Sequence, residues 1–257
     1  ENNGRIRLEG NQSVTVSEFV QGENSSVSYY GNTLGSLALG NEYNILNFED
    51  TAEGSVGAVL KVSKETVISS KGILSLTGAN EFTGKVRLDE AGTVDIKTGK
   101  ALNFEDNAKA DGIRITGGTQ AVSFTGSSEI GNLEVVSSAS VSFEGTASIT
   151  AFSDSVDAGN ISFNEGGEIT SAVTFATAGD VRFGDESSDT FNIGAASPWA
   201  ALVHTDGNTY VQGTLNAASV VLGSETKAVD INGSVNTTGT QTYAGGTILN
   251  GSLAGTT

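Results

Sequence analysis

An apolar pair that recurs at a nearly constant interval along the chain limits its possible folds more than anything else in the sequence. Each copy consists of an apolar residue, a polar residue and a Phe. The copies are Leu102-Asn103-Phe104, Val122-Ser123-Phe124, Val141-Ser142-Phe143, Ile161-Ser162-Phe163 and Val181-Arg182-Phe183. Their Phe residues are separated by 20, 19, 20 and 20 positions. A fixed period of this length is typical of solenoids, in which each repeat packs against its neighbours.

The spacing within each pair indicates a strand with one buried face. Residues i and i+2 of a strand point to the same side, and the residue between them points to the other. If every coil places its pair at the same angle, the Phe side chains stack inside the molecule. The residues expected to face solvent are Asn103, Ser123, Ser142, Ser162 and Arg182. Turn-forming residues after each Phe, such as Glu105-Asp106 and Thr125-Gly126, let the chain change direction.

Less perfect members extend this ladder and add another one. We expect the Phe ladder to continue through Val203, Leu222 and Tyr243, at steps of 20, 19 and 21. A second ladder runs through Ile115, Val135, Val156, Phe175 and Ile193, at steps of 20, 21, 19 and 18. Two ladders out of phase imply at least two strands in each coil.

A coil of this length predicts an all-β fold, a right-handed parallel β-helix with coils of about 20 residues. The coil is too short for a crossover helix with its strands, and it fits three short strands joined by three turns. The consensus of leucine-rich repeats, which share this period, is absent. About twelve coils at a spacing of ~4.8 Å give a rod about 60 Å long. A β-sandwich and a disordered chain are the alternatives.

Composition agrees with strands and turns. The chain has 34 Gly, 1 Pro and no Met, and its hydrophobic residues make up 37%. Ser, Thr, Asn and Gly fill the space between short runs of Val, Ile, Leu and Phe. We expect residues 1–45 to form an irregular N-terminal coil or a cap, and residues 46–257 to form the β-helix. A loop is expected to leave the coil at Ala195-Ala196-Ser197-Pro198-Trp199.

The charge balance limits the possible partners. With 13 Lys+Arg and 30 Asp+Glu the formal net charge is −17, which repels phosphate backbones and anionic lipids. We therefore expect no nucleic-acid binding and no direct membrane insertion of this segment. The absence of Cys excludes disulfides, thiolate metal sites and thiol nucleophiles. Because residue 1 is Glu rather than Met, we expect a processed product or an excised segment.

The Val/Ile-Ser-Phe repeats, the Asn, Gly and Thr turns and the closing segment 240–248 resemble the passenger regions of Gram-negative autotransporters. The chain is also similar to filamentous haemagglutinin-type exoproteins, and most of all to rickettsial surface-antigen passengers. The resemblance covers most of residues 46–257 and lies in composition and period. It implies export through an outer-membrane β-barrel, display at the bacterial surface, and binding to a host-cell receptor or to neighbouring surface proteins.

The chain also departs from subgroups of these families. The Gly-Gly-Ala-Ile tetrapeptides of chlamydial polymorphic membrane proteins are absent. The Gly-Asp-Ser-Gly motif of serine-protease autotransporters is also absent. Gly184-Asp185-Glu186-Ser187 approaches the second motif but lacks the Gly after Ser, and the chain has only 1 His to serve it.

We predict no catalytic, cofactor-binding or metal-ligating residue, and no cofactor. His204-Thr205-Asp206-Gly207 resembles an Asn-Thr-Asp-Gly element of polygalacturonases. The companion Asp-Asp and Gly-His-Gly elements of that family are missing, and glycoside hydrolysis needs a second carboxylate. The acidic stretch from Asp185 to Asp189 fits a solvated turn better than a calcium site. The basic residues read as scattered along the chain.

These observations favour a structural and adhesive rod of a bacterial surface or secreted protein, with binding spread over a long face. Two alternatives stay open. One is a carbohydrate-active β-helix enzyme, for which Asp206 is the residue to mutate. The other is a self-assembling surface-layer component.

Overall fold

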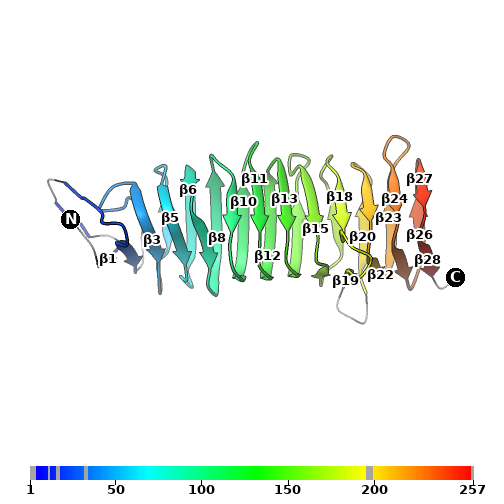
Figure 1. Cartoon of the computed structure of the whole chain (residues 1–257), viewed down its shortest axis with the longest axis horizontal. Coiled ribbons are helices and arrows are strands. Elements are labelled where there is room, and N and C mark those ends of the chain that lie inside the picture. The colour runs from blue at the N-terminus through cyan, green and yellow to red at the C-terminus, as the bar shows by residue number, and fades with distance from the viewer. Residues whose placement is uncertain (1–3, 11, 16–17, 32–33, 195–198, 256–257) are drawn as a thin grey trace.

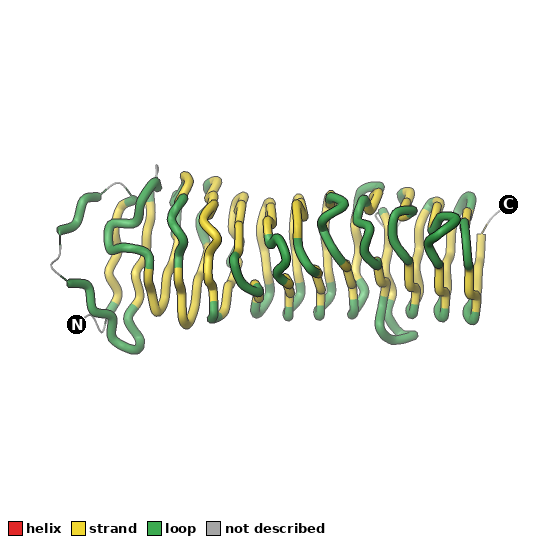
Figure 2. Tube along the Cα trace, turned by 90° about the horizontal axis from the view of Figure 1, so that it is seen from above, coloured by secondary structure: helices red, strands yellow, loops and turns green. Residues whose placement is uncertain are grey.

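The computed structural model describes residues 4–10, 12–15, 18–31, 34–194 and 199–255 of the chain. These residues form 28 strands and no helix. The strands stack into a rod whose N- and C-terminal ends lie at opposite tips (Figure 1). Seen from above, the rungs repeat regularly along the long axis and are joined by loops (Figure 2). The predicted parallel β-helix is confirmed, because strands of successive coils pair in parallel, Phe124 with Phe143 and Phe143 with Phe163.

Two long sheets run the length of the rod. The first sheet consists of β1 (Arg5–Glu9), β2 (Ser26–Tyr30), β3 (Glu42–Phe48), β5 (Lys61–Ile68), β7 (Lys85–Leu88), β9 (Leu102–Phe104), β11 (Ala121–Phe124), β13 (Ser140–Phe143), β15 (Asn160–Phe163), β18 (Val181–Phe183), β21 (Thr209–Val211), β24 (Val229–Ile231) and β27 (Thr247–Leu249). The second sheet consists of β4 (Gly54–Val56), β6 (Ile73–Phe82), β8 (Ala91–Thr98), β10 (Ala108–Thr116), β12 (Ser128–Ser137), β14 (Ala147–Asp154), β16 (Gly167–Ile169), β19 (Thr190–Ile193), β22 (Thr214–Ala217), β25 (Ser234–Thr237) and β28 (Ser252–Gly255).

A separate third sheet exists only toward the C-terminal end. It consists of β17 (Val173–Phe175), β20 (Ala201–His204), β23 (Ser219–Leu222) and β26 (Gln241–Tyr243). In earlier coils the second-sheet strands are longer, with 8 to 10 residues in β6, β8, β10, β12 and β14. Gly112 and Ile113 are both buried, which interrupts the alternation of β10. These long strands therefore bend and cover two sides of the rod.

Stacked Phe side chains fill the interior behind the first sheet. The ring centroids of Phe104, Phe124, Phe143 and Phe163 follow one another at 4.6, 4.7 and 5.0 Å, with nearly parallel planes. All of these rings are buried. The spacing equals the separation of hydrogen-bonded strands, so each ring packs on the ring of the next coil. The central prediction, one interior column of side chains from successive repeats, is confirmed for these coils.

The extension of the Phe ladder beyond Phe183 is wrong. Strand pairing continues the column from Phe183 to Val211, Ile231 and Leu249. The residues predicted to continue the Phe column lie in the third sheet instead. They are Val203, Leu222 and Tyr243. The cause is the coil from Phe183 to Val211, which is longer than the coil from Phe163 to Phe183. Because of its extra residues, the position 20 residues after Phe183 lies on a different side of the rod. That position still falls in a strand, β20 of the third sheet.

The second predicted ladder is correct only at its first step. Ile115 pairs with Val135, but Val135 then pairs with Asp154. Val156 is 62% exposed, so it does not belong to the interior. The remaining members, Phe175 and Ile193, lie in different sheets. The register that the second sheet does keep runs through Ile130, Ile149, Ile169 and Ile193.

Residues 1–45, expected to form an irregular coil or a cap, contribute β1 and β2 to the first sheet. β1 pairs with β2, and β2 pairs with β3, all in parallel. Tyr29 and Tyr43 fill the interior here, and their hydroxyl oxygens lie 3.1 Å apart. Coil stacking therefore begins at Arg5.

Two smaller expectations concern the surface. The polar residues of the first four repeats are half-buried in the outer row, where Ser123 Oγ donates a hydrogen bond of 3.0 Å to Asn103 Oδ1. Arg182 is exposed and lies over the Tyr210 ring at 4.6 Å. Of the expected loop Ala195–Trp199, residues 195–198 lie outside the described part, and Trp199 forms an antiparallel bridge with Gly194. Among the described residues no helix meets the length and hydropathy that a bilayer crossing requires.

Candidate functional site

A groove of about 610 Å³ runs along the outer face of the second sheet. One wall is a row of six side chains, one from each of six successive coils, which we call the charged row. Its members are Lys71, Glu90, Lys109, Glu129, Ser148 and Glu168. Asp111, Thr150 and Thr170, each two positions after a member of the row, also line the groove. The groove therefore presents ammonium, carboxylate and hydroxyl groups to solvent.

The charged row follows from strand alternation and register. Lys109 pairs with Glu129, Glu129 with Ser148, and Ser148 with Glu168, so these residues occupy equivalent positions in β10, β12, β14 and β16. The next position on these strands points inward and is buried. The four members from Lys109 to Glu168 therefore project from the same side of the sheet. Glu90 and Lys71 lie just before β8 and β6 and join the row through the ion pair between them.

A glycine at the bend of the second sheet deepens the groove. A Cβ added to Gly131 would lie 2.2 Å from the carbonyl oxygen of Asp111. A side chain is therefore excluded at this place, where the neighbouring coils carry Asp111 and Thr150. The missing side chain opens the wall of the groove opposite Glu129.

Ion pairs connect the members of the charged row. Lys71 Nζ lies 3.1 Å from Glu90 Oε2, and Lys109 Nζ lies 3.1 Å from Glu129 Oε2. Further along, Ser148 Oγ donates a hydrogen bond of 3.3 Å to Glu168 Oε1. The hydrogen bond from Lys71 and the charges of Lys71 and Lys109 lower the pKa of Glu90. The hydrogen bond to Glu129, with the charges of Glu129 and Glu90, raises the pKa of Lys109. Both groups are therefore ionised at neutral pH.

The interpretation of the basic residues as scattered is wrong. In the part of the chain that the structure describes, thirteen ion pairs join side chains from different coils, and all lie between Arg5 and Glu134. The signal was present in the sequence, because the first four members of the charged row follow one another at steps of 19, 19 and 20. The apolar ladders do not reveal this row, because its members alternate with the buried positions of the same strands.

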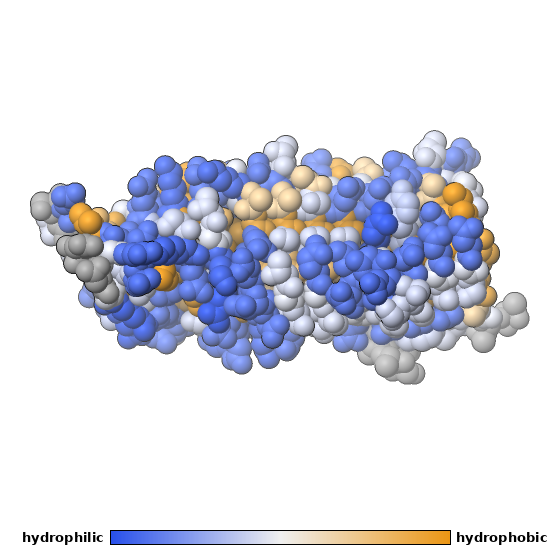
Figure 3. Space-filling model, in the orientation of Figure 1, coloured by the Kyte–Doolittle hydropathy of each residue, from blue (hydrophilic) through white to orange (hydrophobic). Residues whose placement is uncertain are grey.

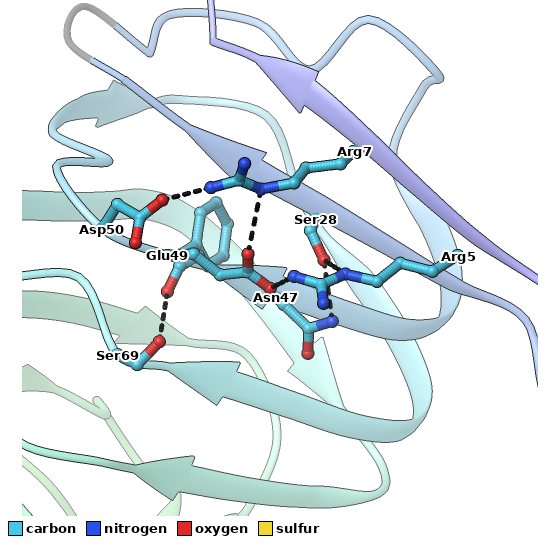
Figure 4. Close-up of polar contacts among 8 residues, drawn as sticks. Arg5, Arg7, Ser28, Asn47, Glu49, Asp50 and Ser69 are labelled. Carbon is cyan, nitrogen blue, oxygen red and sulfur yellow. Dashed lines mark hydrogen bonds and ion pairs between the residues drawn. The ribbon is translucent and has the colours of Figure 1, made fainter.

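A second charged cluster joins the first coils (Figure 4). Arg5 forms an ion pair with Glu49 and donates a hydrogen bond of 3.0 Å to Ser28 Oγ. Arg7 forms ion pairs with Glu49 and Asp50. The Arg7 guanidinium also lies over the Tyr30 ring, 4.0 Å from its centroid. Both arginines are satisfied within the chain, so this cluster ties the first coil to the third.

His204 is part of the core. Its side chain is fully buried, with Nδ1 2.8 Å from Thr209 Oγ1 and Nε2 3.4 Å from the Thr177 carbonyl oxygen. Burial lowers its pKa below the ordinary value of about 6.5, although the hydrogen bond to Thr177 and the carboxylates of Asp206 and Asp180 act in the opposite direction. Asp206 lies in an exposed turn. The structure therefore does not place these two residues in a common cleft.

The acidic turn that was compared with catalytic and calcium motifs is closed by its own last residue. Asp189 Oδ2 accepts hydrogen bonds from the backbone N–H groups of Asp185 (3.0 Å) and Glu186 (2.8 Å). This geometry is a side-chain cap of a turn. Within residues 4–255, leaving out the gaps given above, no group of three or more His, Cys, Asp or Glu is arranged to hold a metal ion.

Comparisons with protein-family models, with the sequences of curated proteins and with solved structures gave no match.

Proposed function

We propose that this chain is a structural and adhesive rod segment of a bacterial surface or secreted autotransporter passenger. In this role it holds binding surfaces away from the cell and mediates adhesion to a host-cell receptor or to neighbouring cells. Export across the outer membrane and display outside the cell are part of the proposal. The resemblance of the Val/Ile-Ser-Phe repeats to such passengers supports this assignment.

One observation carries the structural part of the proposal: the first sheet continues through thirteen strands from β1 to β27. In a solenoid each repeat contacts only its neighbours, so stability propagates along one axis and the shape is elongated. The interior column packs ring on ring through the middle of this sheet. Such a molecule is suited to spacing and presenting surfaces.

The outer surface supports the adhesive part. Hydrophilic residues cover most of the face in Figure 3, and hydrophobic residues show mainly in a band along the middle and at the C-terminal end, with smaller patches near the N-terminal end. Polar rows on successive coils repeat the same groups at a spacing of about 4.8 Å. The groove of the second sheet extends over six such coils. Binding through these rows would be distributed over a long face, with a small contribution from each residue.

The test is a bead adhesion assay. Beads coated with the folded chain are expected to bind host epithelial cells or bacteria that display the chain, and beads coated with the urea-unfolded chain are the control. Equal binding of both bead types would overturn the adhesive role. The absence of catalysis is tested separately: cleavage of acidic polysaccharide by the wild type that is lost in Asp206→Asn would replace this proposal with an enzymatic one.

A further inference from the structure

The charged row is its own complement when it is reversed. From Lys71 to Glu168 its charges read plus, minus, plus, minus, neutral, minus. In a second copy that runs in the opposite direction, Lys71 meets Glu168 and Lys109 meets Glu129. Glu90 then meets Ser148, and no like charges meet. If both copies run in the same direction, every member meets its own kind.

We propose that two copies of this chain associate side by side through the charged row, antiparallel, about a two-fold axis between Lys109 and Glu129. The inference rests on the proposed adhesive function and names its partner, a neighbouring copy of the same chain. A two-fold contact uses one surface twice, so a surface that complements itself is what such a contact needs. Four Lys–Glu pairs and two Ser–Glu pairs result.

The row is available for this contact. Solvent reaches 57% of the Lys71 side chain, 48% of Lys109 and 68% of Glu129. Both copies have the same coil spacing, about 4.8 Å, so pairs aligned at the axis stay aligned over the roughly 24 Å from the first member to the last. A flexible partner would have to be ordered to achieve the same match.

A neighbouring row on the same sheet lacks this property. Asp95, Arg114 and Glu134 lie at paired positions of β8, β10 and β12. Their charges read minus, plus, minus, so full antiparallel overlap brings Arg114 against its copy and Asp95 against Glu134. Arg114 contacts Glu134 at 3.0 Å and Asp95 at 3.5 Å within the chain, as Lys71 and Lys109 contact their own neighbours in the charged row, so the two rows differ in the order of their charges. Arg114 of this row, together with Arg87 of β7, provides the matched control.

Size and charge predict a weak contact with a particular salt dependence. A strip six coils long is smaller than the ~800 Å² per partner of a standard interface. Each copy carries a net charge of −17. At about 0.01 M salt repulsion extends over ~30 Å, and at about 0.15 M only over ~8 Å, whereas the contacting pairs are screened fully only near 1 M. Association should therefore be strongest at intermediate salt. On a cell surface many weak contacts act together.

The experiment uses two charge-inverted variants of the full chain. The acidic variant carries Lys71→Glu and Lys109→Glu. When two copies of it associate antiparallel, like charges face each other at four of the six positions of the charged row. The basic variant carries Glu129→Lys and Glu168→Lys. In its antiparallel pair, positive charges face each other at four of the six positions. Mixed together they regain four opposite pairs and no like pair. Arg87→Glu with Arg114→Glu changes the net charge as much as the acidic variant but leaves the charged row intact.

Sedimentation velocity at about 0.15 M salt measures the result. Each variant alone should self-associate at least tenfold more weakly than the wild type, the mixture should regain association, and the Arg87/Arg114 control should resemble the wild type. Circular dichroism confirms that each variant is folded, and regained association in the mixture shows this independently. A wild type that stays monomeric at every salt concentration overturns the inference, as does association that persists in both variants.

The bead assay separates this inference from the proposed function. If the wild type is monomeric in sedimentation and beads coated with it bind host cells, the self-association is refuted and the adhesive role stands. If the wild type forms dimers in sedimentation but the coated beads bind neither host cells nor bacteria, the adhesive role is refuted and the dimer stands.

Discussion

The two halves of the rod hold their outer rows together by different interactions. Residues 1–134 contain 11 of the 13 basic residues and all the ion pairs of the described chain. Residues 135–257 contain 12 acidic and 2 basic residues, and there side-chain amides connect the coils. Asn216 donates to Asn192 at 2.8 Å, and Asn236 donates to Asn216 at 3.0 Å.

The comparison shows that one backbone plan accepts two kinds of polar ladder. In both halves the interior is mainly apolar and the coils are paired by backbone hydrogen bonds. Ion pairs on an exposed row respond to salt and to titration of their carboxylates. Amide ladders carry no charge and respond to neither. The two halves should therefore answer the same perturbation differently.

The largest effect on stability is expected from a substitution in the apolar interior, which both halves share. Phe143→Ala removes a buried ring from the middle of the interior column, which should lower the free energy of unfolding by about 3–5 kcal/mol. Ser142→Ala, its half-buried neighbour on the outer side, should change it by no more than about 1 kcal/mol. Urea unfolding followed by circular dichroism measures both. If the two variants cost the same, the Phe column does not stabilise the rod.

Acid should weaken the C-terminal half first, because the 1 His of the chain is buried there. The unfolded chain takes up a proton at His204 near pH 6.5, and the folded chain does so only at lower pH. The free energy of unfolding should therefore stay constant above that pH. Below it the free energy should fall by up to about 1.4 kcal/mol per pH unit, until the folded pKa is reached.

Hydrogen exchange at about pH 7 and pH 5.5 can locate this effect. Amides of β17, β20 and β23 should lose protection at the lower pH, while those of β5 and β7 keep it. His204→Gln should abolish the difference. Asp154, whose pKa is raised by burial, is present in both proteins, so its contribution cancels. Equal loss of protection in both halves of the wild type would contradict the prediction.

An amide rung should contribute a smaller amount. Asn216→Ala breaks two half-buried hydrogen bonds and should cost about 1–2 kcal/mol. The cost should be the same at about 0.05 M and 0.5 M salt, because no formal charge is lost. Asn250→Ala, at an exposed contact with Asn232, is the control and should cost less. A cost of Asn216→Ala that depends on salt would show that the halves do not differ as described.

The smallest effect is expected for an ion-pair rung. Arg114→Ala removes exposed contacts with Asp95 and Glu134 and should cost at most about 1 kcal/mol. This cost should shrink as salt rises from about 0.05 M to 0.5 M. Thermal unfolding at the two salt concentrations measures the change. A cost that does not vary with salt would mean that packing of the arginine side chain, rather than its charge, stabilises these coils.

The fold class and the interior of the central coils could be predicted from the residues alone. Where loops keep a constant length, one period in the sequence equals one turn in space, so Phe104, Phe124, Phe143 and Phe163 could be aligned without coordinates. The same reasoning predicted that the polar residues between the buried pairs form an outer row.

The register beyond Phe183, the third sheet and the ion pairs within the charged row required the three-dimensional arrangement of the coils. Backbone pairing fixes which residues are neighbours, and it accommodates a long coil as readily as a short one. A fixed period in the sequence cannot detect such an insertion, so Val203 was placed in the wrong sheet. The contact of Lys109 with Glu129 depends on which residues of β10 and β12 are paired, and that pairing is a property of the folded chain.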